Sequence, residues 1–177
     1  MRLFIALDLP SEVKKNLNLI IKDFNDIRGL RFADPENSHL TLLFIGESDN
    51  QEAIKEKLKQ IRFEPFYIKT DKLGYFEHYN KLKVFWLGLS KSGELIALQK
   101  QIQDLLPFVK PDFDQFNPHL TIARANPDVD ANRLKEKISR YNIPASQIKV
   151  DSVKLYSSDL RHGKPAYTML AKFDAKK

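Results

Sequence analysis

The sequence repeats itself at an offset of 80 residues, and this repeat constrains the fold more than any other feature. The tripeptide His-Leu-Thr occurs in SHLTLLFIG, residues 38–46, and again in PHLTIAR, residues 118–124. Further on, IKTDKLGYF at 68–76 aligns with IKVDSVKLY at 148–156, with three of the first four residues identical. An offset that holds over such a distance is typical of a duplicated unit. We therefore expect two similar lobes related by an approximate two-fold axis.

Each half of the chain shows the same order of predicted elements. Apolar residues recur at helical spacing in four segments, and runs rich in β-branched and aromatic residues predict strands between them. Both halves, 1–89 and 90–177, consist of a helix, a His-Leu-Thr strand, a helix and two strands, the last two near 146–157 and 166–173. The prediction is one α+β domain over 1–177, a duplicated two-lobed fold with antiparallel sheets lining a central groove and helices outside.

The predicted helices are recognised by their apolar faces. The first follows Pro10 and Ser11, and the second is expected to open with a capping box formed by Asp49 and Glu52. The apolar faces of the second and fourth helices match at the offset of 80. They consist of Ile54, Leu58 and Ile61 in one helix and of Leu134, Ile138 and Tyr141 in the other.

The composition is that of an ordinary globular protein with a mild excess of positive charge. The 177 residues are 42% hydrophobic and 29% charged, and the net charge of +6 favours anionic partners such as phosphate or nucleic acid. The absence of cysteine excludes disulfides, thiolate nucleophiles and cysteine zinc sites. No stretch approaches the ~20 apolar residues of a membrane span, and MRLFIALDLP lacks the features of a signal peptide. We expect a cytoplasmic protein.

The His-Leu-Thr strands suggest acid–base chemistry. Alternate residues of a strand share a face, so His39 and Thr41 point one way and Leu40 the other, and the same holds for His119 and Thr121. Histidine, with a pKa near 6.5, can be neutral or protonated at cellular pH, which provides both a general base and a general acid. Threonine hydroxyls can hydrogen-bond charged phosphate oxygens. The set suits in-line displacement at phosphorus.

Other chemistries fit the sequence less well. A G-x-S-x-G elbow, a glycine-rich phosphate loop and the H-E-x-x-H and H-x-H spacings are all missing, so no metal is expected. The alternative is that the two motif histidines are merely structural, hydrogen-bonded within a repeated strand. His78 and His162 fall in predicted loops and should be solvated. Phe4, Tyr156 and Tyr167 could stack on a base, although aromatic residues in strands usually belong to the core.

These motifs resemble those of the 2H phosphoesterase superfamily, which carries two H-x-[ST]-x motifs on the lobes of a duplicated fold. The chain is most similar to the RNA 2′,3′-cyclic phosphodiesterases, the LigT-like family formerly called 2′-5′ RNA ligases. The resemblance covers RLFIALDLP, LRFADPENSHLTLLFIG, FNPHLTIAR and the closing LYSSDLRHGKPAYTMLAKF. One departure is Phe32, where relatives often carry Trp, and no catalytic consequence is expected from it.

The resemblance implies a reaction without metal or cofactor, in which a 2′,3′-cyclic phosphate at an RNA end is opened to a 2′-phosphate. By motif position, His39 would be the proton donor to the leaving 3′ oxygen. His119 would be the base that activates water. Thr41 and Thr121 would hold the phosphate, and Arg124 would be a further phosphate contact.

The position of Arg124 raises a geometric requirement. In a regular strand Arg124 and His119 face opposite sides, because they are five residues apart. The arginine can reach the same phosphate only if a bulge or the end of the strand lies near Ala123. Otherwise it is an ordinary surface arginine.

Alternative functions remain open at this point. The substrate could be RNA with a 2′,3′-cyclic phosphate end, a small cyclic nucleotide such as a cyclic ADP-ribose phosphate, or a 2′-5′-linked oligonucleotide, and the enzyme could also catalyse the reverse ligation. A non-catalytic RNA-binding module with a relic groove is a different possibility, and the two intact motifs argue against it. We expect a monomer without membrane contact.

Overall fold

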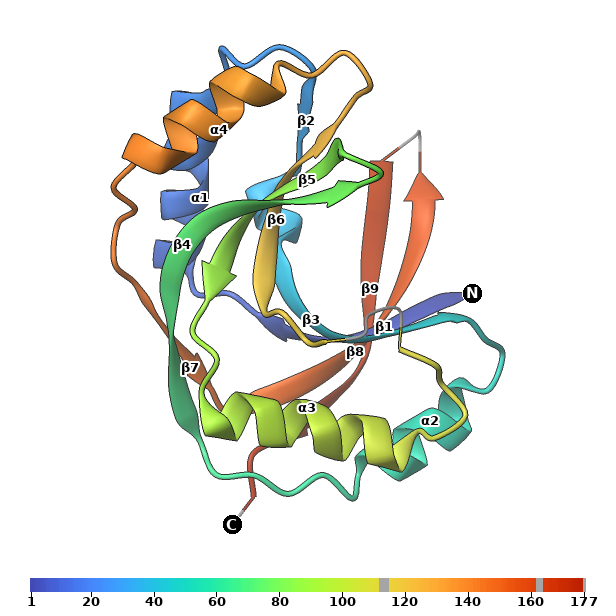
Figure 1. Ribbon diagram of the computed structural model, residues 1–177. Coiled ribbons are helices and arrows are strands. Elements are labelled where there is room, and N and C mark those ends of the chain that lie inside the picture. Colours follow the sequence, from blue (N-terminus) through green and yellow to red (C-terminus); the bar gives the residue numbers. More distant parts are fainter. Residues whose placement is uncertain (112–114, 162–163, 177) are drawn as a thin grey trace.

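The computed structural model describes residues 1–111, 115–161 and 164–176, which form four α-helices and nine strands (Figure 1). No helix in these ranges is long and apolar enough to cross a membrane. The helices are α1 (Ser11–Phe24), α2 (Gln51–Leu58), α3 (Gly93–Leu105) and α4 (Ala131–Arg140). The strands are β1 (Arg2–Asp8), β2 (Leu30–Phe32), β3 (His39–Glu47), β4 (Phe66–His78), β5 (Lys81–Leu89), β6 (His119–Ala125), β7 (Gln147–Val150), β8 (Ser152–Arg161) and β9 (Lys164–Asp174).

The strands form two antiparallel sheets, which confirms the predicted α+β class. One sheet has the order β3-β1-β8-β9 and the other β2-β6-β5-β4-β7. Each sheet combines strands from both halves of the sequence, since β8 and β9 lie beside β1 while β4 and β5 lie beside β6. The two lobes are therefore interleaved, and neither lobe corresponds to one half of the chain.

The five-stranded sheet ends with the pairing of β4 with β7. Ile68 lies opposite Ile148, and these positions are themselves 80 residues apart, so equivalent points of the repeat meet here. The prediction of a single strand at 146–157 is wrong, because the chain leaves this sheet after β7 and pairs with β1 as β8. The buried side chains change from even to odd positions at this step, from Val150 to Val153.

The strand pairing favours a different repeat boundary from the one that the element order predicts. The offset of 80 also relates β1 to β5, which share the pattern Leu-x-Leu at residues 7–9 and 87–89. Each His-Leu-Thr strand has one of these two strands as its neighbour. We propose that the repeated unit is strand, helix, strand, helix, strand, spanning 2–78 and 81–161. In this division β5 opens the second unit instead of closing the first.

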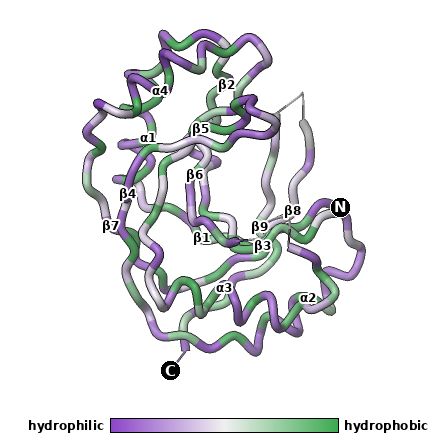
Figure 2. The backbone as a smooth tube through the Cα atoms, in the orientation of Figure 1, coloured by the Kyte–Doolittle hydropathy of each residue, from purple (hydrophilic) through white to green (hydrophobic). Residues whose placement is uncertain are grey.

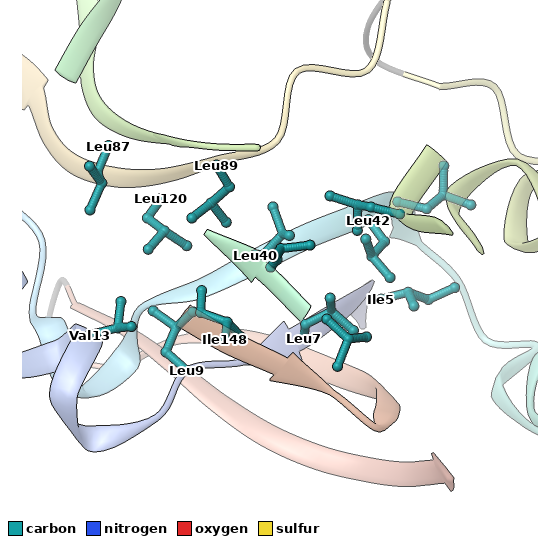
Figure 3. Close-up of a cluster of buried hydrophobic side chains, with 14 of the residues drawn as sticks. Ile5, Leu7, Leu9, Val13, Leu40, Leu42, Leu87, Leu89, Leu120 and Ile148 are labelled. Carbon is teal, nitrogen blue, oxygen red and sulfur yellow. The ribbon is translucent and has the colours of Figure 1, made fainter. Parts of the chain in front are cut away.

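The core lies behind both His-Leu-Thr strands. Residues of β3 and β6 approach within 8 Å at their Cα atoms, and Leu40 and Leu120 are 1% and 0% exposed. Figure 3 shows both leucines in one cluster with Leu87 and Leu89 of β5. Hydropathy alternates along the helices in Figure 2, as expected for elements with one buried face. Because the leucines point into the core, the histidine and threonine of each motif point away from it.

The helices lie outside the sheets, as predicted (Figure 1). Phe24 on α1 contacts Phe85 on β5 with ring centroids 4.9 Å apart and also packs against Tyr141, which follows α4. These contacts place α1 and α4 over the five-stranded sheet. On the other sheet, the side-chain amide of Gln99 on α3 donates to the carbonyl of Leu42 on β3 at 3.5 Å. Each sheet thus has its own helical cover.

The capping box predicted with Asp49 is wrong. The N-cap of α2 is Asn50, and no side chain caps the first turn. Glu52 forms an ion pair with Lys55 at 2.7 Å instead. The backbone N–H of Asn50 donates to the Ser48 hydroxyl at 3.2 Å, so a serine turn precedes the helix and the helix starts one residue later than predicted.

Replacing Leu120 by Ala should lower the free energy of unfolding by about 2–5 kcal/mol, because its fully buried side chain leaves a cavity in the core between β3 and β6. Leu19→Ala is the matched control, since Leu19 on α1 is 52% exposed, and its cost should stay within about 0.5 kcal/mol. Urea denaturation followed by circular dichroism measures both values. Equal losses in the two variants would contradict a shared core behind the motifs.

Candidate active site

β3 and β6 carry the same irregularity in their strands. Leu42 and Leu43 are both buried in β3, and Ile122 and Ala123 are both buried in β6. At these positions the pairing of each strand with its neighbour shifts by one residue. Two consecutive residues facing the same side are the mark of a β-bulge, which reverses the alternation for the residues that follow.

The bulge required for Arg124 to reach the phosphate is present. Because the alternation reverses before it, Arg124 lies on the same face of β6 as His119 and Thr121, and its side chain is exposed. The matching residue of β3 is Phe44, which is 36% exposed. The two motifs therefore share a backbone shape but present a cation in one lobe and an aromatic ring in the other.

The two motif histidines make the same hydrogen bond. The Nδ1 atom of His39 lies 2.9 Å from the carbonyl oxygen of Asn37, and that of His119 lies 2.7 Å from the carbonyl oxygen of Asn117. A carbonyl oxygen can only accept, so Nδ1 carries the proton in both rings. In the neutral ring Nε2 then holds the lone pair that accepts a proton. Each lobe thus offers a preoriented base or, when protonated, an acid.

Aromatic rings from the opposite repeat unit pack against each histidine. Phe76, at the end of the first unit, meets His119 edge-on with centroids 4.9 Å apart. Its equivalent at the offset of 80 is Tyr156, whose ring is stacked 6.5 Å from His39. Phe4, which is 3% exposed, stacks on both Tyr156 and His39, with its ring centroid 4.7 Å from that of His39. It therefore holds the imidazole in place.

Trp86 forms part of the wall beside the second motif. It pairs with Thr121 across β5 and β6, and its ring centroid is 6.2 Å from that of His119. The indole lies over Gly74 of β4, where a Cβ atom would come within 2.2 Å of the ring. Only glycine leaves room for the indole at this position. The sequence alone provided no signal for this pair.

Asp8 is a site residue that sequence reasoning missed. It lies opposite His39 in the pairing of β1 with β3. Lys154 forms an ion pair with its carboxylate, and the Tyr156 hydroxyl donates to it at 2.5 Å. Burial acts to raise the pKa of Asp8, but the hydrogen bonds from Lys154 and Tyr156 outweigh it, and the pKa is lowered. The carboxylate is therefore charged at neutral pH.

The carboxylate of Asp8 gives His39 a charged neighbour at the position opposite it, whereas the residue opposite His119 is Gly88. Burial lowers the pKa of His39, while the hydrogen bond to the Asn37 carbonyl and the charge of Asp8 act to raise it. The net lowering makes the imidazole mainly neutral at pH 7. A negative charge bound nearby would act in the same direction as Asp8 and favour protonation.

The remaining predicted residues lie on the same polar faces. Thr41 and Thr121 are partly buried, and within the described ranges neither hydroxyl makes a hydrogen bond to the protein. Tyr167 of β9 lies near groups of both sheets. It meets His39 edge-on with centroids 5.1 Å apart, and the charge of Arg124 acts on its hydroxyl against the pKa rise that burial causes. The polar faces of the two sheets therefore approach each other here.

The one other histidine in the described ranges, His78, makes its ring contact with Tyr79. His78 ends β4 and is exposed beside Tyr79 and Asn80, whose positive φ values of 49° and 57° form the hairpin turn. His162 lies outside the described residues. Among the described residues no group of three or more His, Cys, Asp or Glu side chains could hold a metal ion. Metal independence stays a prediction.

Comparison with known proteins places this geometry in a family. A model of the 2′-5′ RNA ligase superfamily matches residues 21–162. The chain belongs to this superfamily. An RNA 2′,3′-cyclic phosphodiesterase of Archaeoglobus fulgidus is 30% identical over 98% of the chain and 100% of the relative. One from Thermotoga maritima is 34% identical over 96% of the chain and 93% of the relative.

A comparison with solved structures tests the predicted fold separately from the sequence comparisons. Escherichia coli LigT complexed with 3′-AMP matches with a TM-score of 0.81, at 24% identity, over 99% of this chain and 98% of that one. The predicted LigT-like fold is therefore confirmed. The predicted roles of the site residues remain proposals, which the geometry above supports.

We expect His39 to titrate below its ordinary pKa of 6.5 in the free protein, because burial dominates its environment. Asp8→Asn should lower the pKa of His39 further, since the charge of Asp8 raises it, and binding of inorganic phosphate should raise it. NMR titration of the imidazole measures all three. Asp104→Asn on α3 removes an equal charge from an exposed side chain and should leave the value unchanged. A pKa above 6.5 in the free protein would contradict this account.

Proposed function

We propose that this protein is an RNA 2′,3′-cyclic phosphodiesterase, which hydrolyses a 2′,3′-cyclic phosphate at an RNA end to a 2′-phosphomonoester. The observation that carries the proposal is the matched pair of imidazoles, each donating through Nδ1 to a carbonyl, which makes Nε2 the atom for proton transfer. A threonine hydroxyl lies on the same strand face beside each imidazole. Relatives 30% and 31% identical over nearly the full chain are named for this reaction.

Hydrolysis forms one P–O bond and breaks another. A water oxygen attacks phosphorus while the bond to the 3′ oxygen opens, and the phosphate stays on the 2′ oxygen. A neutral imidazole takes a proton from the water, and an imidazolium gives a proton to the 3′ oxygen. In-line attack places the entering and leaving oxygens on opposite sides of phosphorus, which suits two imidazoles carried by different sheets.

The charges around the histidines support a division of roles. His39 is the proton donor and His119 is the base. The carboxylate of Asp8 favours the imidazolium form of His39, and the position equivalent to Asp8 in the second motif is Gly88. The negative charge of the bound substrate adds to the effect of Asp8 and offsets the burial that keeps His39 neutral in the free protein.

The phosphate is held by neutral and charged donors. The hydroxyls of Thr41 and Thr121 donate to its non-bridging oxygens, where the charge develops. Arg124 adds a guanidinium that can bind two oxygens at once. Because Phe44 occupies the equivalent place in the first motif, the cation acts from one side only and orients the phosphate between the two histidines.

All groups in this scheme come from one chain, so we propose that the enzyme is monomeric and metal-independent. We further propose that it acts in the cytoplasm, on RNA ends or small cyclic nucleotides. The 2′-5′ ligation for which the superfamily is named would use the same base and the same donor, with the 5′-hydroxyl of a second RNA attacking phosphorus in place of water while the bond to the 3′ oxygen breaks. Turnover of a cyclic phosphate is the direct test of the principal proposal.

Hydrolysis of cytidine 2′,3′-cyclic phosphate should continue at an unchanged rate in excess EDTA, because proton transfer and charge stabilisation both have donors on the protein. Chromatography should identify cytidine 2′-phosphate as the product. Complete loss of activity that added divalent metal restores would show a metal-dependent enzyme instead. Formation of the 3′-phosphate would mean that the 2′ oxygen is the leaving group.

His39→Ala and His119→Ala should each lower kcat on a cyclic phosphate by roughly 10²–10⁴-fold, because each removes one proton-transfer step. A substrate with sulfur in place of the 3′ oxygen has a better leaving group and needs less protonation. His39→Ala should therefore recover much of its rate on that analogue, while His119→Ala should not.

The control for this experiment is His78→Ala, which removes an exposed imidazole at the β4–β5 turn and should leave both rates unchanged. Circular dichroism and thermal unfolding establish that the variants are folded. Recovery of His119→Ala in place of His39→Ala would reverse the assignment of donor and base.

A further inference from the structure

A second arginine lies next to Arg124 on the same polar face. In the pairing of β2 with β6, Arg31 is directly opposite Arg124. Residues opposite each other in an antiparallel pair project from the same side of the sheet. The neighbouring pair, Phe32 with Ala123, turns the other way, since Ala123 is fully buried and Phe32 packs against the core. The two guanidinium groups therefore share the exposed side.

The two arginines have no counterion within the described part of the chain. Both side chains are exposed, and no ion pair or side-chain hydrogen bond joins either to another described residue. Like charges directly opposite each other in a sheet repel. Two uncompensated guanidinium groups at one place are therefore costly to the folded protein on their own and suit the binding of an anion with more than one charge.

The order of strands places Arg31 one step beyond the reacting phosphate. His119, Thr121 and Arg124 follow one another along β6, and Arg31 extends this row sideways onto β2, the outer strand of the sheet. Neighbouring strands are ~4.8 Å apart, so the two guanidinium groups can bind separate phosphates. A nucleotide chain has its next phosphate on the 5′ side of the terminal nucleotide.

We propose that Arg31 binds the phosphodiester that precedes the terminal nucleotide and thereby makes the enzyme prefer RNA chains over mononucleotides. This inference rests on the proposed function and deepens it, because it selects among the substrates that the same two histidines could process. Arg31 is a specificity residue in this account. It contacts a part of the substrate that does not react, and its contribution belongs to substrate binding.

The test compares Arg31→Gln with the unmodified protein on two substrates. One is cytidine 2′,3′-cyclic phosphate, which lacks a 5′ phosphate, and the other is the dinucleotide ApC ending in the same cyclic phosphate. The variant should raise KM for the dinucleotide by roughly 10–100-fold, as expected for a lost charged hydrogen bond, and change the mononucleotide kinetics less than about twofold. The salt dependence of dinucleotide binding should weaken by about 0.7 in slope.

A dinucleotide with an uncharged methylphosphonate linkage completes the cycle. The unmodified protein should bind it as weakly as Arg31→Gln binds the natural dinucleotide, and the variant should show no additional loss. Arg31→Lys keeps the charge but loses the planar fork, so its KM should fall between those of the other two proteins. The matched control is Arg28→Gln, an exposed arginine in the loop before β2, with unchanged kinetics on both substrates.

Three results would overturn the proposal. An equal rise in KM for both substrates would place Arg31 on the reacting phosphate. An unchanged KM of Arg31→Gln for the dinucleotide would make Arg31 an ordinary surface residue. An equal effect of Arg28→Gln would indicate non-specific attraction between the protein and RNA. If the unmodified protein opens neither cyclic phosphate, the proposed function fails. Affinities for ApC with a 3′-phosphate and for its methylphosphonate form then still decide whether Arg31 binds the linkage.

Discussion

The structure depends on the burial of the leucine that stands between histidine and threonine in each His-Leu-Thr motif. Leu40 and Leu120 face a core that β3 and β6 share, and fully burying such a side chain is worth about 1.5–3 kcal/mol. Strand alternation then forces the polar members of each motif to the opposite face. The orientation of the motif imidazoles and hydroxyls is therefore a consequence of core packing, and the same packing brings the two strands into contact.

Interleaving of the repeat units makes the site a joint product of both. Tyr156 is stacked beside His39 and Phe76 meets His119 edge-on, and each of these rings comes from the last strand of the opposite unit. Tyr167, on a strand outside the repeat, contacts His39, and the charge of Arg124 from the other motif acts on its hydroxyl. A single unit would lack these contacts, so neither half of the sequence could form the site alone.

The backbone of the site is nearly symmetric, but its charges are not. Both motifs have a bulge and a histidine held by a carbonyl two residues earlier. Asp8 corresponds to Gly88, and Arg124 corresponds to Phe44. The carboxylate lies in the lobe of the proposed donor, and the cation lies in the lobe of the proposed base. The two motifs of the duplicated scaffold thus differ in their charged neighbours, while the strand geometry is the same.

The sequence alone determined the repeat, the α+β class and the residues of both motifs, because the periodicity and the offset of 80 are visible in the order of residues along the chain. It could not show that 146–157 divides between two sheets, since the break follows from which strands lie nearby. The tertiary structure alone brought Asp8 to His39 and Arg31 to Arg124. These neighbours are distant in sequence, and strand register, which is set by bulges and by packing of the shared core, decides which side chains meet.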